Sequence, residues 1–191
     1  MSKLAMWNLI TLDGFFEGEK SWDLDWHQLV LGPEFEDFAI AQLKSCDRLI
    51  FGRVTYEGMA AYWSNAQGEI ADLMNRLPKV VFSRTLQNPE WQNTIVATSD
   101  LVDQVRALKE DGQGYSLVVG SGSLSRSLMS YNLFDEYRIL IAPIILGNGN
   151  LLFGNKLARH NLKLKETRNL ARGAVILFYE PAETGSTCVE T

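Results

Sequence analysis

The sequence predicts an α/β fold with a mainly parallel sheet and antiparallel strands at its C-terminal end. Apolar runs of strand length alternate with amphipathic segments over the first two thirds of the chain, as in parallel strands joined by helices. After residue 135, strands separated by turn residues replace this alternation, which indicates hairpin pairing. The first strand, residues 3–12, is almost wholly apolar, as expected of a strand covered on both faces.

The first two thirds of the chain contain the expected alternation of elements. After the first strand, the pair Asp13-Gly14 predicts a turn, and residues 17–33 predict a long loop. Pro33 suits a first helical position, and Ser99 suits a helix cap. Further strands are expected at 47–51, 79–82, 94–97 and 116–119, and helices are expected from 33, from about 55, at 69–76, from 99 to about 109, and at 123–130.

The last third is expected to hold three strands and a tail. Residues 136–146 predict a long strand that turns at 147–149. Residues 162–165 alternate apolar and basic side chains, and residues 174–180 lie across a turn at 169–173, so the two segments predict a β-hairpin. Residues 1–180 are therefore expected to form one domain, and residues 181–191 a polar tail.

Composition excludes several classes of function. The net charge is −5 and the pI about 5.1, so the chain lacks the basic footprint of a nucleic-acid-binding protein. It has no apolar run of membrane-spanning length and no signal-peptide pattern, so we expect a cytoplasmic protein. Two cysteines, Cys46 and Cys188, do not make a disulfide framework, and His27 and His160 lack metal-ligand spacing, so no metal site is expected.

Three strand ends share small, hydroxyl or basic residues. In open α/β sheets, ligands collect outside the carboxyl ends of the strands, and helix N-termini there bind phosphate. Arginines and hydroxyls suit an adenosine 2′-phosphate, which favours NADP over NAD. Taken singly, the glycine segment is more typical of a tight strand-to-helix turn, and the arginines are more typical of a solvated surface. The segments are Gly52-Arg53-Val54-Thr55, Ser83-Arg84-Thr85 and Gly120-Ser121-Gly122-Ser123-Leu124-Ser125.

These motifs carry a family resemblance. LIFGRVTYE, VVFSRTL and VVGSGSLSRSLM resemble the cofactor segments of the dihydrofolate reductase fold. TLDGFFEG and PIILGNGNLLF resemble the branch that contains the reductase domain of the bifunctional deaminase-reductases of riboflavin synthesis, which reduce a ribosylaminopyrimidine. The resemblance covers residues 3–180. It implies a three-layer α/β/α, dihydrofolate reductase-like fold with about eight strands, and a homodimer with contacts around 143–149 and the hairpin.

The resemblance also implies where NADPH binds, because the cofactor would lie across the strand ends. The nicotinamide would rest near Asn8 and Leu9. Phosphate groups would meet Gly52, Arg53 and Thr55, the adenosine end would meet Ser83 and Arg84, and the pyrophosphate would meet Gly120, Ser121, Gly122, Ser123 and Leu124.

Candidate catalytic acids are Glu36 and Asp13. On a helical wheel Glu36 lies at the edge of the apolar face of the first helix, from which it can reach a cleft, although acids in a first turn also simply complement the helix dipole. Asp13 ends the first strand near the expected nicotinamide, where it can equally serve the turn.

Substrate contacts are expected from Asp25 and Trp26, in a loop whose tryptophans suit a lid, and from Tyr56. For the loop tryptophans the alternative is anchoring of a surface loop, and for Tyr56 it is core packing. The sequence thus predicts an NADPH-dependent reductase of a pterin-like, pyrimidine-like or carbonyl substrate. The alternatives are a non-catalytic nucleotide- or pterin-binding module of the same fold and a structural dimer.

Overall fold

The structure, a computed structural model, describes residues 1–182. Its strands are β1 (Lys3–Thr11), β2 (Phe15–Glu17), β3 (Cys46–Gly52), β4 (Lys79–Phe82), β5 (Thr94–Ala97), β6 (Tyr115–Val119), β7 (Glu136–Ala142), β8 (Asn150–Leu151), β9 (Leu162–Asn169) and β10 (Val175–Pro181). Its helices are α1 (Pro33–Lys44), α2 (Arg53–Trp63), α3 (Glu69–Arg76), α4 (Leu101–Glu110) and α5 (Gly122–Ser130), with a short 3₁₀ helix η1 (Asp25–Leu29) before α1.

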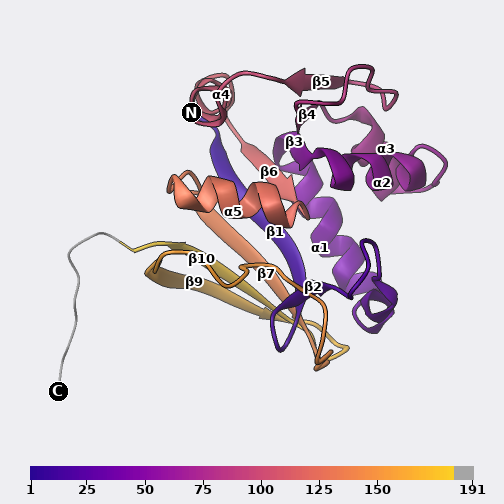
Figure 1. Cartoon of the computed structure of the whole chain (residues 1–191). Helices are drawn as coiled ribbons and strands as arrows, with labels where there is room; N and C mark the ends of the chain where they lie inside the picture. The colour runs from indigo at the N-terminus through magenta and orange to yellow at the C-terminus, as the bar shows by residue number, and fades with distance from the viewer. Residues whose placement is uncertain (183–191) are drawn as a thin grey trace.

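Eight of the strands form one mixed sheet in the order β5-β4-β3-β6-β1-β7-β10-β9. The pairs from β5 across to β7 are parallel, whereas β10 runs antiparallel to both β7 and β9. β2 and β8 pair as a separate small antiparallel sheet. The expected mainly parallel sheet with a C-terminal hairpin is therefore confirmed, and the parallel strands bring their carboxyl ends to one edge (Figure 1).

Helices cover both faces of the sheet, as the three layers in Figure 1 show. Alternate side chains of β1 point to opposite faces, so Ala5 and Trp7 join the core beneath α1 to α3, whereas Leu4 and Met6 join the core beneath α4 and α5. Because β1 is buried on both faces, it has to be apolar along nearly its whole length. Among residues 1–182, no helix combines the length and apolarity needed to cross a lipid bilayer.

Most elements form where the sequence predicts them, but some begin or end at other residues. α2 begins at Arg53, directly after β3. The cap of α4 is Asp100, whose carboxylate accepts hydrogen bonds from two backbone N–H groups of the first turn, in place of Ser99. β7 ends at Ala142 because Pro143, which follows it, has no N–H to continue the ladder.

The loop at 17–33 and the expected tail also differ from the prediction. The loop contains η1, and β2 ends at its first residue. β10 extends through Pro181, the first residue of the expected tail. Residues 183–191, with Cys188, lie outside the described residues.

Candidate functional site

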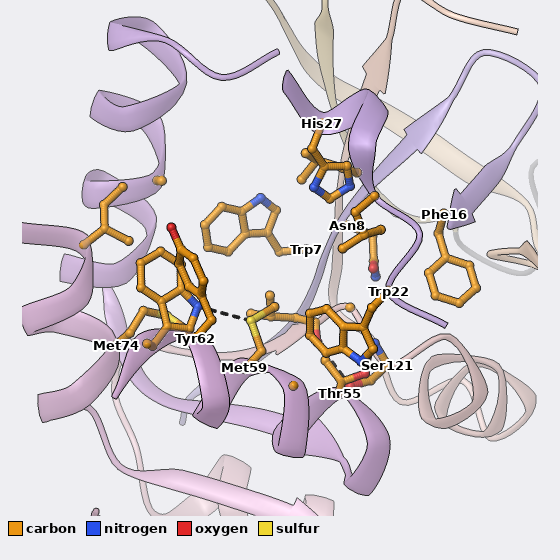
Figure 2. A pocket seen from close by; sticks show the side chains of 18 of the residues that line it. Trp7, Asn8, Phe16, Trp22, His27, Thr55, Met59, Tyr62, Met74 and Ser121 are labelled. Atoms are coloured by element: carbon orange, nitrogen blue, oxygen red, sulfur yellow. Dashed lines mark hydrogen bonds between the residues drawn. The ribbon is translucent and has the colours of Figure 1, made fainter. Parts of the chain in front are cut away.

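One cavity of about 1130 Å³ lies at the carboxyl ends of the neighbouring strands β3, β6 and β1. Its walls come from these strand ends, from α1, α2 and α3, from the first turn of α5, and from the segment between β2 and α1. A volume of this size exceeds what a drug-sized ligand needs, so it can hold a dinucleotide or a dinucleotide with a second molecule. Figure 2 shows one end near α5 and the other near Tyr62 and Met74.

The end near α5 is built from two strand ends that hydrogen-bond to each other, and we call it the glycine-rich end (Gly52, Arg53, Thr55 and residues 120–124). The Gly52 N–H donates to Ser121 Oγ at 3.1 Å, and the Ser121 N–H donates to Thr55 Oγ1 at 3.1 Å. Ser121 Oγ donates in turn to the Val119 carbonyl. Thr55 and Ser121 therefore fix the relative position of the α2 and α5 N-termini.

At this end, α5 begins after two residues in left-handed backbone conformations, and no side chain accepts a hydrogen bond from its first-turn N–H groups. Gly120 and Ser121 adopt left-handed conformations with φ of +58° and +57°, and no side chain caps the helix. The N–H groups of Gly122, Ser123 and Leu124 therefore remain without intrahelical partners at the positive end of the helix dipole. A Cβ on Gly122 would lie 2.9 Å from the Phe16 ring, so only glycine fits between that ring and the helix.

The expected arginines lie in different settings. Arg53 lines the cavity, and its guanidinium donates to both oxygens of Glu57 one turn along α2, at 3.0 and 2.8 Å. Ser83 and Arg84 do not line the cavity. Ser83 Oγ accepts from the Thr85 and Leu86 N–H groups and so forms a turn. β4 nevertheless ends directly beside β3, so this third strand end adjoins the glycine-rich end without entering the cavity.

Three buried polar atoms without partners lie at the middle of the cavity. They are Trp7 Nε1, Asn8 Nδ2 and His27 Nε2, and all three residues line the cavity (Figure 2). Leu9 lines it beside them. A buried polar group without a hydrogen bond costs about 1–3 kcal/mol, so three of them at one place are typical of a site that a ligand completes.

The imidazole of His27 is neutral at physiological pH. Burial lowers its pKa to about 4 because the charged form loses water. The ring packs edge-on against Trp26, with centroids 4.4 Å apart. His27 therefore offers the cavity a neutral hydrogen-bonding group.

The opposite end of the cavity is apolar, and we call it the helix-lined end (Ile40 and Leu43 of α1, Met59, Tyr62 and Trp63 of α2, and Met74 of α3). The Trp63 indole N–H donates to Met59 Sδ at 3.2 Å, which is the dashed line in Figure 2. Aromatic faces and flexible thioethers suit a flat apolar ligand.

Trp22 covers the cavity between its two ends. It is 38% exposed and adopts a left-handed backbone with φ of 69°. Its ring lies against α2 where Gly58 has no side chain, since a Cβ there would come within 2.0 Å of the ring. Of the two loop tryptophans, Trp22 lines the cavity and Trp26 does not.

The two expected acids differ in position. Glu36 is exposed and lines the cavity, as the helical wheel indicates. Asp13 does not line it. The carboxylate of Asp13 accepts from Thr11 Oγ1 at 2.6 Å and from the Leu146 and Gly147 N–H groups at 3.1 and 2.8 Å. Desolvation raises the pKa of Asp13, but these hydrogen bonds outweigh it and hold the pKa below its ordinary value.

The structure places the three expected substrate contacts outside the cavity. Asp25 is exposed at the start of η1, and Trp26 is buried in the core. Tyr56 is also buried, and its hydroxyl accepts from the Trp91 N–H at 3.0 Å. Core packing, the alternative for Tyr56, therefore describes it. Cavity residues that the sequence did not single out for the site include Trp7, Phe16, His27, Met59, Tyr62 and Met74.

The mixed sheet, its covering helices and the cavity at its central strand ends define a protein of the dihydrofolate reductase-like class. The model of the RibD C-terminal domain family matches residues 2–176. The chain therefore belongs to the family of RibD C-terminal domains, and the resemblance seen in the motifs is confirmed.

Individual relatives are consistent with this assignment. The uncharacterized protein YyaP of Bacillus subtilis (strain 168) is 32% identical over 177 residues, covering 89% of this chain and 90% of its own. A putative riboflavin biosynthesis protein from Shewanella sp. PV-4 superposes with a TM-score of 0.79 at 22% identity, covering 95% and 99% of the two chains. A diaminohydroxyphosphoribosylaminopyrimidine deaminase/5-amino-6-(5-phosphoribosylamino)uracil reductase from Thermotoga maritima gives 0.67 at 14% identity, with 95% of this chain covering 57% of that one.

Proposed function

We propose that the protein is an NADPH-dependent reductase that transfers a hydride to a small heterocyclic or carbonyl substrate. This proposal rests on one observation, that groups suited to a phosphate and groups suited to a polar ring line the same cavity. Uncapped helix N–H groups at the glycine-rich end suit phosphate, and unpartnered polar atoms of Trp7, Asn8 and His27 at the middle suit a ring with polar substituents.

The residues present fit NADPH in kind. The N–H groups of Gly122, Ser123 and Leu124 would hold the pyrophosphate, and Asn8 would donate to the nicotinamide end. When bound, NADPH supplies a hydride, and reduction of a C=O or C=N bond also takes up one proton. Glu36 is the acid of the chain that lines the cavity from α1 and is the candidate for delivering that proton.

A preference for NADPH over NADH is part of the proposal. Arg53 lines the glycine-rich end, and Arg84 follows the neighbouring strand β4. A 2′-phosphate would pair with guanidinium groups, although it has to compete with Glu57 for Arg53. Family membership supports a reductase, because the Thermotoga relative carries a uracil reductase activity in its name.

Calorimetric titration of the intact chain with NADPH and NADH tests the proposal. We expect a micromolar dissociation constant for NADPH and a weaker one for NADH. Replacing both Arg53 and Arg84 by Ala is expected to remove most of that preference, whereas Arg159→Ala, a change in the polar loop before β9, leaves it intact. Absence of heat with either cofactor would refute the proposal.

The second candidate is a non-catalytic nucleotide- or pterin-binding module, and the observation in its support is that Asp13 and Asp25 lie outside the cavity. The reductase retains Glu36 as its acid. A Glu36→Gln variant separates the two candidates, because a reductase using this acid loses turnover while keeping NADPH binding. Bound NADPH with no oxidation over a broad panel of heterocycles and carbonyls supports the module.

A homodimer remains part of the proposal. β9 is an edge strand, and every one of its residues is exposed, including Leu162 and Leu164. Ile145, which shortly precedes the turn at 147–149, is 71% exposed. Exposed edges of this kind are commonly covered in native assemblies. Light scattering on the purified chain distinguishes a dimer from a monomer.

A further inference from the structure

The cavity's two ends differ in charge and polarity, and this difference bears on the substrate of the proposed reductase. Among the described residues that line the cavity, Arg53 is the one with a permanently cationic side chain, and it belongs to the glycine-rich end. His27 is neutral because burial lowers its pKa to about 4. The helix-lined end therefore has no cation of its own to receive a phosphate.

The acidic residues strengthen this contrast. Glu36 and Glu69 line the cavity from the first turns of α1 and α3. The α3 N-terminus would otherwise suit an anion, but Glu69 already places a carboxylate there. Lys44 does not line the cavity, and its ammonium pairs with Glu69 at 2.6 Å. The charge of Glu69 is thus balanced by Lys44, whereas Glu36 forms no ion pair among the described residues, so a phosphorylated ligand at this end would meet the negative charge of Glu36.

The chemistry of the walls favours a different ligand. Leu43 and Met74 are almost fully buried, and Met59 and Trp63 are partly buried and in contact with each other. Met59 and Trp63 line the cavity from α2, Leu43 lines it from α1, and Met74 lines it from α3. A ligand that covers the exposed parts of Met59 and Trp63 gains free energy, and the thioether and ring face of these two residues favour an aromatic plane.

We infer that the helix-lined end accepts an uncharged, flat and largely apolar substrate with a reducible C=O or C=N bond, and that it rejects a phosphorylated ribosylaminopyrimidine. The inference rests on the proposed function, because it assigns the glycine-rich end to NADPH. The unpartnered nitrogens of Trp7 and His27 lie between the two ends, where they can donate to the oxygen or nitrogen of that bond. The substrate class thus differs from the one named for the Thermotoga relative.

The test compares three ligands on the intact chain saturated with NADP⁺. Calorimetry is run with 2-naphthaldehyde, with 5-amino-6-(5-phosphoribosylamino)uracil and with the same compound lacking its phosphate. We expect 2-naphthaldehyde to bind at least about tenfold more tightly than the phosphorylated compound, since a buried phosphate without a cation loses its hydration. Removing the phosphate is expected to improve binding of the pyrimidine.

Two variants place a cation at the helix-lined end, Ile40→Arg from α1 and Met59→Arg from α2. Ile95→Arg, at an exposed position of β5 outside the cavity and outside the proposed dimer contact, is the matched control. Both cavity variants are expected to bind 2-naphthaldehyde about tenfold more weakly and the phosphorylated compound more tightly. NADPH affinity stays within about twofold, because the glycine-rich end is unchanged. The control behaves as the wild type.

Failure of this inference is distinguishable from failure of the proposed function. If NADPH does not bind the wild type, the proposed function is refuted. If NADPH binds but the phosphorylated pyrimidine binds more tightly than 2-naphthaldehyde, or is reduced faster, the inference alone is overturned. It is also overturned if 2-naphthaldehyde shows no binding, and the wild-type comparison decides this even if a variant does not fold.

Discussion

Substitution of Gly58 by Ala tests whether the Trp22 ring rests on α2 beside the cavity. A Cβ on Gly58 would lie 2.0 Å from Cζ2 and 2.1 Å from Cε2 of Trp22, so the ring has to leave the surface of α2. Without this clash, Ala in place of Gly inside a helix stabilises a protein by about 1 kcal/mol. The observed effect therefore depends on whether Trp22 is present.

The magnitude follows from the covered surface of Trp22. The residue is 38% exposed, so folding covers about 150 Å² of a large aromatic side chain. At about 25 cal/mol per Å², complete exposure would cost about 4 kcal/mol, an upper estimate. Lifting only the part of the ring over α2 costs about 1–2 kcal/mol, which cancels or exceeds the helical gain.

Urea unfolding of a double-mutant cycle measures this coupling. Gly58→Ala is expected to change the free energy of unfolding by less than about 1 kcal/mol in the wild-type background and to stabilise the Trp22→Ala variant by about 1 kcal/mol. The coupling free energy is then about 1–2 kcal/mol. Equal stabilisation in both backgrounds would show that Trp22 does not rest on α2.

Three further predictions concern polar groups of the site. Asn8→Leu removes a buried amide nitrogen that has no hydrogen-bond partner, so it is expected to raise the free energy of unfolding of the free protein by about 1 kcal/mol, measured by urea unfolding. The same change is expected to weaken NADPH binding. A lower free energy of unfolding would contradict this prediction. The pKa of His27 is about 4 in the folded chain and about 6.5 in the unfolded chain, so the unfolded state binds the proton first as pH falls. The free energy of unfolding is therefore expected to decrease by about 3 kcal/mol between pH 6.5 and pH 4. His27→Phe is expected to remove this decrease, and an unchanged pH profile in the variant would refute the prediction. The pKa of Asp13 is lowered on folding, so its contribution to the free energy of unfolding is present above about pH 4 and is lost as pH falls through the folded pKa. Asp13→Asn is therefore expected to make the free energy of unfolding depend less on pH in the acid range. A steep dependence in the variant would exclude Asp13 as its source.

Local chemistry explains which parts of the fold and site could be predicted. Gly52 and Gly120 follow apolar runs of strand length, and Pro33 opens a helix, so a short stretch of sequence suffices for each. The parallel order then brings the ends of β3 and β6 together at one edge. Since ligands collect outside the carboxyl ends of parallel strands, a shared ligand could also be expected from the sequence. Family resemblance added which part of NADPH each segment would meet.

The remaining parts depend on contacts between distant residues. Asp13 binds Leu146 and Gly147, more than a hundred residues away, so its sequence neighbours do not reveal that its carboxylate is occupied. Trp22 and Trp26 occupy the same loop with similar neighbours. Trp22 covers the cavity because Gly58 of α2 leaves room for it, whereas Trp26 enters the core. Long-range packing of this kind leaves no local pattern.

Hydrogen–deuterium exchange of the intact chain, with and without saturating NADPH, tests most directly whether the two strand ends hold one dinucleotide. Binding is expected to slow exchange together at residues 52–55, at residues 122–124 and around Asn8, while the distant hairpin of β9 and β10 stays unchanged. Slower exchange at only one of the two strand ends, or only at residues outside the cavity, would contradict a shared cofactor site.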